Sequence, residues 1–255
     1  MAVGERRLEG TSALVTGAAR RIGRAISLAL AREGANVAVH YGSSEKEAAV
    51  LVAEIEGLGG RAVAIRADLS DSSDLDGLVG RAGEELGKLE ILVNNASIFP
   101  IDTLETIDLE SLERSAEINA WAPLALTRAF AAQTERGHVV NLLDSRVSGF
   151  DRTHVAYILS KHVLSVLTRI CALELAPGIA VNGIAPGLIL PPPGKDEDYV
   201  DRLARTLPLE RRGAPEDIAA AAIFLVTSEF VTGETIYVDG GRHLKENVPD
   251  GPDSR

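Results

Sequence analysis

The feature that most constrains the fold of this chain is a repeated alternation between short apolar runs and longer amphipathic segments. The apolar runs cover residues 12–16, 36–40, 62–66, 89–93, 138–143, 179–184 and 235–238, and apolar residues recur at helical spacing within 22–30, 75–86 and 153–175. Alternating strands and helices are typical of a parallel sheet, because a crossover helix returns the chain to the same edge. The pattern predicts an α/β fold: a single-domain, doubly wound Rossmann-type parallel sheet flanked by helices on both faces.

Length and charge narrow the classes of partner. The 255 residues, 45% of them hydrophobic, suit one domain over residues 1–255. The net charge of -11 and the lack of a basic stripe disfavour nucleic acid and anionic membranes as partners. Cys171 is the only cysteine, which excludes an intrachain disulfide and favours a reducing, cytoplasmic location. We expect no signal peptide and no membrane span, since no run of about 20 apolar residues is evident.

A glycine-containing loop directly follows the first predicted strand: Thr16-Gly17-Ala18-Ala19-Arg20-Arg21-Ile22-Gly23. Gly17 would let the backbone turn tightly beside a pyrophosphate, and Gly23 would let the next helix pack closely on the sheet. The N-terminus of that helix offers free N–H groups and a positive dipole to phosphates. The loop therefore predicts a dinucleotide site, with an ordinary glycine turn as the alternative. Arg21 stands where a glycine would be usual.

The end of the second predicted strand indicates which dinucleotide is preferred. The segment Val39-His40-Tyr41-Gly42-Ser43-Ser44 has no carboxylate before Glu45, whereas NAD-preferring enzymes usually place one there. A carboxylate about 4 Å from a 2′-phosphate would cost on the order of 4 kcal/mol at an effective dielectric of 20. Its absence favours NADPH, with Arg20, Arg21, His40, Ser43 and Ser44 as candidate contacts, unless these residues only solvate a loop. Asp68 either accepts from an adenine amino group or caps the following helix.

Tyr157 and Lys161 are spaced to share one face of the predicted helix over residues 153–175. A nearby ammonium favours phenolate, so we expect Lys161 to lower the pKa of Tyr157 from about 10 and to make it a proton donor. Alone, the pair is equally typical of an exposed helix surface. Asp144 lies upstream, at the end of the apolar run over residues 138–143.

Seven motifs in order along residues 8–244 resemble the short-chain dehydrogenase/reductase family: Thr16-Gly17…Gly23, Ala67-Asp68-Leu69, Asn94-Asn95-Ala96, Asn119, Tyr157-x-x-x-Lys161, Pro186-Gly187 and Asp239-Gly240-Gly241. The resemblance implies that Tyr157 is the general acid, that Lys161 lowers its pKa and holds the nicotinamide ribose, and that Asn119 helps to relay protons through water. It implies cofactor contacts from Gly17, Arg20, Arg21, Ile22, Gly23, His40, Tyr41, Ser43, Ser44, Asp68, Leu69, Asn95, Ala96, Tyr157, Lys161, Pro186 and Gly187.

Asp144 departs from the family pattern, because it stands where the family has its catalytic serine. An ionised aspartate cannot donate a hydrogen bond to a carbonyl, and it would repel a developing oxyanion. The enzyme is therefore either impaired or directed to a substrate that needs a carboxyl group. Reduction of a C=N bond needs a proton on nitrogen, which a carboxylic acid can supply. Burial would raise the pKa of Asp144 and Lys161 would lower it, and the sequence does not rank the two effects.

The pteridine reductases, a branch of the family, resemble this chain in three places: Asp144 in place of serine, Arg21 in the glycine loop, and Phe99 after Asn94-Asn95-Ala96. The C-terminal Val238–Leu244 segment is also similar to dihydromonapterin reductases. The resemblance implies an NADPH-dependent reductase that converts a dihydropterin, such as dihydromonapterin or dihydrobiopterin, or dihydrofolate to the tetrahydro form. Phe99 would stack a pterin against the nicotinamide, or it is a core or lid residue with no ligand. The substrate candidates are Arg21, Ser97, Phe99, Asp144 and Tyr157.

Two other functions stay open. The first is a carbonyl reductase for a 3-oxoacyl thioester, sugar or small ketone, and the second is a non-catalytic NADPH-binding regulatory protein. Family membership implies a homotetramer. We expect no metal site, because the histidines lack metal-ligand spacing and Asp196-Glu197-Asp198 reads as the acidic start of a helix. We expect a lid over residues 188–210 and a loose tail over 245–255.

Overall fold

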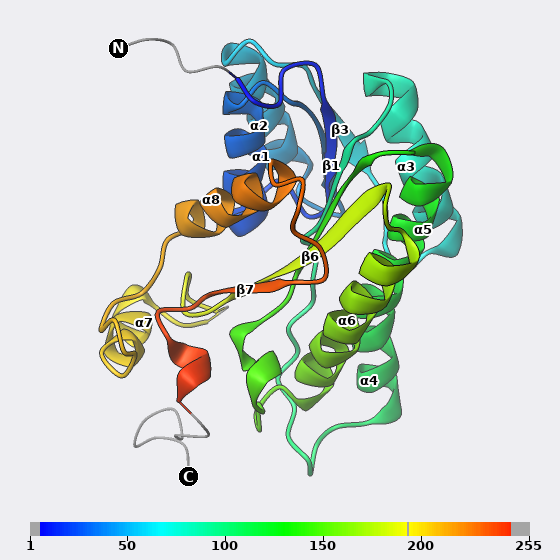
Figure 1. Cartoon of the computed structure of the whole chain (residues 1–255). Coiled ribbons are helices and arrows are strands. Elements are labelled where there is room, and N and C mark those ends of the chain that lie inside the picture. The colour runs from blue at the N-terminus through cyan, green and yellow to red at the C-terminus, as the bar shows by residue number, and fades with distance from the viewer. Residues whose placement is uncertain (1–5, 193, 246–255) are drawn as a thin grey trace.

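Figure 1 shows a computed structural model of the chain, which describes residues 6–192 and 194–245. Seven parallel strands form one sheet in the order β3-β2-β1-β4-β5-β6-β7. The strands are β1 (Ser12–Val15), β2 (Asn36–Tyr41), β3 (Ala62–Arg66), β4 (Ile91–Asn94), β5 (Gly137–Leu142), β6 (Ile179–Pro186) and β7 (Thr235–Val238). The predicted doubly wound α/β fold is confirmed. The predicted tail beyond Lys245 and Pro193 in the lid lie outside the described residues.

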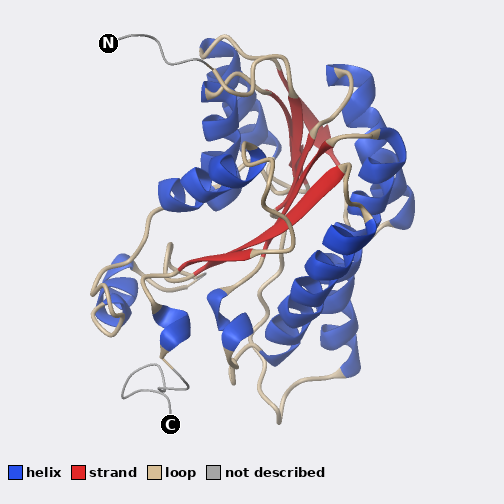
Figure 2. Cartoon of the chain, viewed as in Figure 1, coloured by secondary structure: helices blue, strands red, loops and turns tan. Residues whose placement is uncertain are grey.

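Helices cover both faces of the sheet, as the blue helices around the red strands show (Figure 2). On one face lie α1 (Arg21–Arg32), α2 (Glu45–Gly57) and α8 (Pro215–Val226). On the other lie α3 (Ser72–Leu86), α5 (Ala122–Gln133) and α6 (Val155–Glu174), with α4 (Leu109–Ala116) packed on α6. Shorter pieces are the π-helix η1 (Glu117–Trp121), the 3-10 helices η2 (Ser145–Ser148) and η3 (Arg242–Leu244), and α7 (Glu197–Ala204) in the lid.

The core has two large apolar layers, one on each side of the sheet, and a smaller cluster of Ala120, Leu143, Leu164 and Ala185. Ala13 and Val15 of β1 belong to the layer under α1 and α8, whereas Leu14 belongs to the layer under α3 and α5. Successive side chains of a strand point to opposite faces, and both faces here are covered. This explains why all four residues of β1 are buried and why three of them are apolar, with Ser12 as the polar one. The central strands therefore hold their carboxyl ends in fixed positions at one edge of the sheet.

Helix α6 is the longest and most apolar of the helices that line the site. Among the described residues it is the one helix long and apolar enough to cross a membrane, with a mean hydropathy of 1.3 over its best window. Half of that window is buried inside the fold, and its inner face carries the site residues Tyr157 and Lys161. Its outer face exposes an apolar stripe: Leu159, Val163, Val166, Ile170 and Leu173. We interpret α6 as a core helix with one uncovered apolar face.

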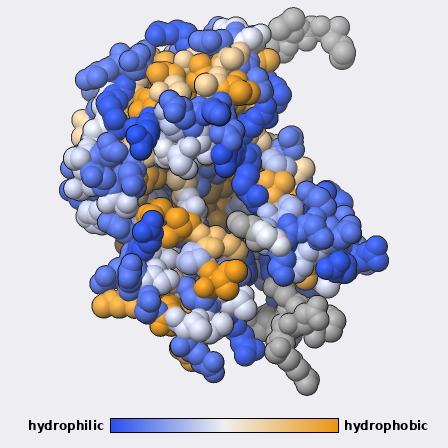
Figure 3. All heavy atoms as spheres, turned by 180° about the vertical axis from the view of Figure 1, so that it is seen from behind, coloured by the Kyte–Doolittle hydropathy of each residue, from blue (hydrophilic) through white to orange (hydrophobic). Residues whose placement is uncertain are grey.

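The reverse side of the molecule is mostly polar (Figure 3). Hydrophobic residues gather near its top and around a hollow close to its middle. They form separate groups on this face and no continuous apolar belt.

Candidate active site

The carboxyl edge of the sheet brings the predicted site residues together. The glycine loop follows β1, the Asn95–Phe99 segment follows β4, and Asp144 follows β5. The chain order reverses between β1 and β4, which are neighbours in the sheet. In open α/β sheets, ligands bind outside the strand ends at such a switch point.

The glycine loop has a backbone that only glycine fits well. Gly17 has a positive φ of +59°, and a Cβ on Gly23 would lie 2.4 Å from the Gly17 carbonyl oxygen. Helix α1 then begins at Arg21 with no side-chain cap and no acidic residue in its first turn. Its first N–H groups can therefore bind an anion, as a pyrophosphate requires.

Arg21 adopts the left-handed conformation that favours glycine, with φ of 55°. This explains why a glycine is usual at the position, and why arginine there carries a conformational cost of about 1–3 kcal/mol. The Arg21 guanidinium donates to the carbonyl oxygen of Pro191 at 3.0 Å. Arg21 thus links the glycine loop to Pro191, in the segment that the sequence predicts to be a lid.

His40 supports the glycine loop from inside the fold. The ring is buried; its Nδ1 accepts from the Gly17 N–H at 3.0 Å, and its Nε2 lies 3.1 Å from the Ala67 carbonyl oxygen. Burial lowers the pKa of His40 to about 4, so the ring is neutral and donates through Nε2. The predicted contact between His40 and a cofactor phosphate is wrong, because both ring nitrogens are already occupied.

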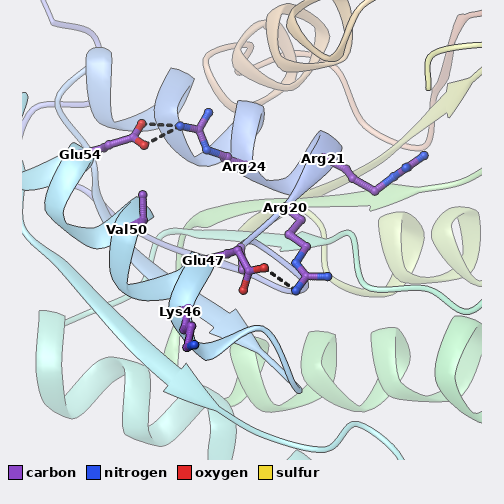
Figure 4. A pocket seen from close by; sticks show the side chains of 8 residues that line it. Arg20, Arg21, Arg24, Lys46, Glu47, Val50 and Glu54 are labelled. Atoms are coloured by element: carbon purple, nitrogen blue, oxygen red, sulfur yellow. Dashed lines mark hydrogen bonds and ion pairs between the residues drawn. The ribbon is translucent and has the colours of Figure 1, made fainter. Parts of the chain in front are cut away.

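A pocket of about 420 Å³ lies between α1 and α2, where the glycine loop leads into α1 (Figure 4). Arg20 pairs with Glu47 at 2.5 Å across it, while Arg21 extends away from that pair. Arg24 and Lys46 add two more cations to the lining. An exposed ion pair is worth about 0–1 kcal/mol, so Arg20 can leave Glu47 for a more highly charged anion at little cost. The predicted Tyr41, Ser43 and Ser44 precede α2 on this side.

Three further cofactor candidates have local roles of their own. The Asp68 carboxylate accepts from the Ser70 N–H and hydroxyl, and the N-cap of α3 is Asp71. The capping alternative for Asp68 is therefore wrong, and its carboxylate stays at the surface. Leu69 is buried in the core, so only its backbone could face a cofactor. The Asn95 amide donates to the carbonyl oxygens of Thr16 and Gly17, which ties the β4 loop to the glycine loop.

The other predicted cofactor contacts border these loops. Ile22 lies in the first turn of α1, Ala96 follows Asn95, and Ala96 N–H donates to the Thr16 hydroxyl at 3.0 Å. Pro186 ends β6, and the Gly187 N–H donates to the Val238 carbonyl oxygen at 3.0 Å. A Cβ on Gly187 would lie 2.6 Å from the Cα of Asp239, so this crossing of two loops needs a glycine.

The centre of the site is a hydrogen bond between Tyr157 and Asp144. The Tyr157 hydroxyl donates to Asp144 Oδ2 at 3.0 Å. Lys161 donates from Nζ to the Leu142 carbonyl oxygen at 2.7 Å and lies 5.8 Å from the centre of the Tyr157 ring. Burial and then the negative charge of Asp144 raise the pKa of Tyr157 well above its ordinary value. The expectation that Lys161 lowers this pKa is wrong for the protein without ligand. Burial lowers the pKa of Lys161 itself to about 8.

Arg146 decides the charge of Asp144. Burial raises the pKa of Asp144, but the charge of Arg146 and its hydrogen bonds outweigh burial, and the pKa lies below its usual value. Asp144 Oδ1 accepts from the Arg146 backbone N–H at 2.8 Å and from its Nε at 3.2 Å. Asp144 is therefore a carboxylate near neutral pH. The charge of Asp144 stayed open in the sequence analysis, because burial and Lys161 were the two effects weighed there and Arg146 was not.

Phe99 lies in an aromatic and charged cluster beside this pair. His154 stacks on the ring with centroids 3.9 Å apart, and Tyr157 meets it edge-on at 4.5 Å. The Arg146 guanidinium carbon lies 5.6 Å from the ring centre. His154 Nδ1 lies 2.8 Å from Asp151 Oδ2, and Arg146 also contacts Asp151. One face of Phe99 is thus already covered by His154.

Asn119 holds the loop that carries Ser97. It lies in the π-helix η1 and is fully buried. Its Nδ2 donates to the Ile98 carbonyl and Ser160 hydroxyl oxygens, and its Oδ1 accepts from the Ile98 N–H and the Ser97 hydroxyl. The amide has then used its two donors and two acceptor positions. The Asn119 side chain itself has no free polar atom to offer a water relay.

Arg146, Asp151 and His154 are the functional residues that the sequence reasoning missed. The local signal was the acidic–basic pair at Asp144 and Arg146, directly after a buried strand. A second signal was Asp151 three residues before His154. Within residues 6–192 and 194–245, no cluster of His, Cys, Asp or Glu could hold a metal ion.

Comparison with known proteins agrees with this geometry. The family model described as enoyl-(acyl carrier protein) reductase matches residues 17–243. The chain belongs to the short-chain dehydrogenase/reductase family. It is an oxidoreductase of that family by sequence, by the glycine loop after β1 and by the buried Tyr157 and Lys161.

Curated relatives of this short-chain dehydrogenase/reductase act on different substrates. The L-rhamnose 1-dehydrogenase (NAD(P)(+)) of Sphingomonas sp. (strain SKA58) is 36% identical over 253 residues, covering 93% of this chain and 98% of the relative. The 3-oxoacyl-[acyl-carrier-protein] reductase FabG of Staphylococcus epidermidis (strain ATCC 35984) is 33% identical over 241 residues, covering 91% and 99%. These identities show the family and do not select a substrate.

Solved structures include a pteridine-type neighbour. FolM alternative dihydrofolate reductase 1 from Brucella canis, complexed with NADP, superposes with a TM-score of 0.91 at 35% identity, covering 96% of this chain and 98% of that one. A blue fluorescent protein from a metagenomic library, in complex with NADPH, gives a TM-score of 0.86 at 36% identity, covering 92% and 98%. The resemblance to the pteridine reductase branch is therefore shared by sequence motifs and by fold.

Proposed function

We propose that the protein is an NADPH-dependent reductase of a C=N bond in a flat nitrogen heterocycle, a dihydropterin or dihydrofolate. The observation that carries the proposal is the Asp144 carboxylate bonded to Tyr157 at 3.0 Å. A carbonyl substrate develops negative charge on oxygen during reduction, and a neighbouring carboxylate would oppose that charge. A ring nitrogen that gains a proton becomes more positive, and the same carboxylate would stabilise it.

The cofactor proposal rests on the shape and charge of the glycine-loop region. The uncapped first turn of α1 fits a pyrophosphate, and the cations of the α1–α2 pocket fit a 2′-phosphate. The FolM and blue fluorescent protein structures contain NADP and NADPH. When bound, NADPH supplies the hydride. We propose that Lys161, whose ammonium is held by Leu142, orients the nicotinamide ribose.

Tyr157 and Asp144 together would stabilise a substrate nitrogen that solvent has protonated. Tyr157 keeps its proton at neutral pH because its pKa is raised, and Asp144 accepts the hydrogen bond from it. Asp144 is ionised and therefore cannot itself be the first proton donor, which revises the role we expected from the sequence. We propose that the carboxylate faces the ring nitrogen and favours its protonated form. Phe99 would pack on the heterocycle with the part of its ring that His154 leaves uncovered.

A carbonyl reductase is the second candidate, and the relatives favour it. L-rhamnose 1-dehydrogenase and 3-oxoacyl-[acyl-carrier-protein] reductase are as similar in sequence to this chain as FolM is. A neutral Tyr157 would also suit a carbonyl substrate as general acid. This candidate requires that Asp144 be tolerated beside a developing oxyanion, with Tyr157 and the Arg146 guanidinium, 3.0 Å and 3.5 Å from Oδ2, as the nearby donors.

We also propose that the protein is a cytoplasmic homotetramer. The exposed apolar stripe on α6 supports self-association, because five large apolar side chains share one helix face: Leu159, Val163, Val166, Ile170 and Leu173. A contiguous exposed apolar surface of this kind is typical of an interface. The outer face of α6 would then be covered by a second copy.

A substrate panel tests the proposed function. NADPH oxidation would be followed with a dihydropterin, dihydrofolate and a 3-oxoacyl thioester at equal concentrations, and NADP⁺ reduction would be followed with an aldose. We expect kcat/KM for the dihydropterin to exceed that for the thioester by at least tenfold. The opposite ranking would favour the carbonyl reductase, and cofactor binding with no turnover of any substrate would favour a regulatory protein.

A further inference from the structure

The segment between β5 and α6 contains a charge network that the Tyr157–Lys161 motif does not require. Arg146 lies between two carboxylates, Asp144 and Asp151, whose side chains are 14% and 5% exposed. Asp151 is held in turn by the Thr153 N–H and hydroxyl, both at 2.9 Å, and by His154. Such burial of charges is costly unless each is paired and hydrogen-bonded. The network therefore fixes one arrangement of this segment.

Arg146 connects the two groups that would touch a substrate. Its backbone N–H and Nε hold Asp144 Oδ1, whereas Oδ2 accepts from Tyr157 at 3.0 Å and has only a long contact of 3.5 Å with Arg146 Nη2. Its guanidinium also lies beside Phe99. It contacts Asp151, which in turn holds His154, and the His154 ring stacks on Phe99. The charge state of the carboxylate and the position of the aromatic wall thus depend on one side chain.

We propose that Arg146 is a positioning residue that keeps Asp144 ionised and directs its Oδ2 at a substrate whose reacting ring nitrogen is protonated. The second half of this inference rests on the proposed function. With nitrogen already protonated, hydride adds to the carbon of C=N⁺–H, the π electron pair moves to nitrogen, and a neutral CH–NH product forms. The cofactor is oxidised to NADP⁺, and the proton comes from solvent before the hydride step. The substrate charge falls from +1 to 0, and no oxyanion arises.

The charged groups around Asp144 come from three elements. Arg146 belongs to η2, Tyr157 and Lys161 belong to α6, and the positive charge of Arg242 in η3 also lowers the pKa of Asp144. Arg146 is the member of this set that hydrogen-bonds the carboxylate with both backbone and side chain. Its removal should let burial dominate, and the carboxyl of Asp144 would then keep its proton to a higher pH.

The test compares Arg146→Met with the unaltered protein in two measurements. The first is the ¹³C NMR titration of aspartate-labelled protein without substrate, with the Asp144 resonance identified by its loss in Asp144→Asn. The second is the pH profile of kcat/KM with NADPH and a dihydropterin. We expect the Asp144 titration and the acid limb of the profile both to move up by at least one pH unit. Unmoved titration, or an activity loss equal at every pH, would overturn the proposal.

Two further variants keep the test decisive if Arg146→Met does not fold. Arg146→Lys keeps the charge but not the forked donors, and we expect a smaller upward shift of the same limb; no shift would contradict the proposal. Arg152→Met, at an exposed arginine of the same segment, should shift nothing, and an equal shift there would show that the effect is not specific to Arg146. Failure of the unaltered protein to reduce a dihydropterin would contradict the proposed function. The NMR titration would still show whether Arg146 keeps Asp144 ionised.

Discussion

At the residue scale, the chemistry of the site depends on the charge of Asp144. A serine at this position could donate to a carbonyl oxygen, whereas the ionised Asp144 can only accept. Arg146 donates to Oδ1 at 3.2 Å and to Oδ2 at 3.5 Å, and Tyr157 donates to Oδ2 at 3.0 Å. The carboxylate is therefore held by specific hydrogen bonds from neighbouring residues, which a chance replacement of serine would not be expected to have.

Replacing Asp144 separates the two candidate functions. We expect Asp144→Ala to lower kcat/KM for a dihydropterin at least a hundredfold, because the protonated nitrogen loses its counter-charge. Asp144→Ser should fail to restore that activity and should raise turnover of a 3-oxoacyl thioester. Steady-state kinetics of the three proteins with both substrates provide the measurement. Full dihydropterin activity in Asp144→Ala would show that Asp144 has no role in the reduction.

Phe99→Ala should affect the substrate more than the cofactor. Loss of the ring removes the aromatic contact, and we expect KM for the dihydropterin to rise about tenfold, equivalent to about 1.4 kcal/mol. The Kd for NADPH, measured by fluorescence titration, should change less than twofold. Phe230→Ala, at a fully exposed phenylalanine, is the matched control and should leave both constants unchanged. An equal loss of NADPH binding in Phe99→Ala would place the ring at the cofactor instead.

The sequence predicted the residues of the site better than their roles. Asp144, Tyr157, Lys161 and Phe99 come together as expected, because each follows or lies beside a strand end at one edge of the sheet. The direction of the Tyr157 pKa was wrong, since spacing along a helix does not reveal that Lys161 donates to Leu142 or that Asp144 accepts from Tyr157. His40 was misassigned because a strand pattern does not tell whether a ring turns inward to hold the glycine loop.

At the element scale, strands were easier to predict than helices. Each expected strand is present to within about two residues, because buried parallel strands are short continuous apolar runs. Helices α2, α4, α5 and α8 were not predicted. In α8, the run Ile218–Val226 is apolar almost throughout, so it shows no helical period. The π-helix η1, which places Asn119, inserts into the α4–α5 path and also leaves no period in the sequence.

The outer stripe of α6 predicts how the chain associates. Val163→Lys together with Val166→Glu should place charges in the proposed interface and lower the molar mass measured by light scattering after size exclusion. Both residues are half exposed, so the fold should persist, with far-UV circular dichroism unchanged. Lys46→Glu and Arg32→Glu, on the opposite side of the sheet, form a control that leaves the mass unaltered. An unchanged mass in the α6 variant would place the interface elsewhere.

At the scale of the whole molecule, the sheet places the glycine loop after β1 and Asp144 after β5 at the same edge. The glycine loop and the α1–α2 pocket supply cations for the cofactor phosphates, whereas Asp144 supplies a carboxylate where the substrate nitrogen would lie. The net charge of -11 makes the cationic pocket a local exception on an acidic protein. The cofactor end is therefore marked by exposed cations, whereas the substrate end holds a buried carboxylate that is paired with Arg146.

This arrangement predicts that NADPH stabilises the protein more than NADH does. A ligand present at 100 times its Kd stabilises the folded state by about 2.7 kcal/mol. We expect the Tm to rise more with NADPH than with equimolar NADH, and the difference to shrink as salt screens the 2′-phosphate contact. Arg20→Ala should reduce the difference, whereas Arg169→Ala on α6 should not. Equal stabilisation by both cofactors would argue against a 2′-phosphate site in this pocket.

The central claim is that hydride reaches a ring carbon of a C=N bond, and isotope transfer tests it most directly. NADPH deuterated at the transferring position of the nicotinamide would be incubated with the protein, a dihydropterin and a 3-oxoacyl thioester in one tube. The account predicts a tetrahydropterin that carries one deuterium on the ring carbon next to the reduced nitrogen, formed faster than any labelled hydroxyacyl product. Deuterium found only in the hydroxyacyl product, with the dihydropterin unchanged, would contradict it.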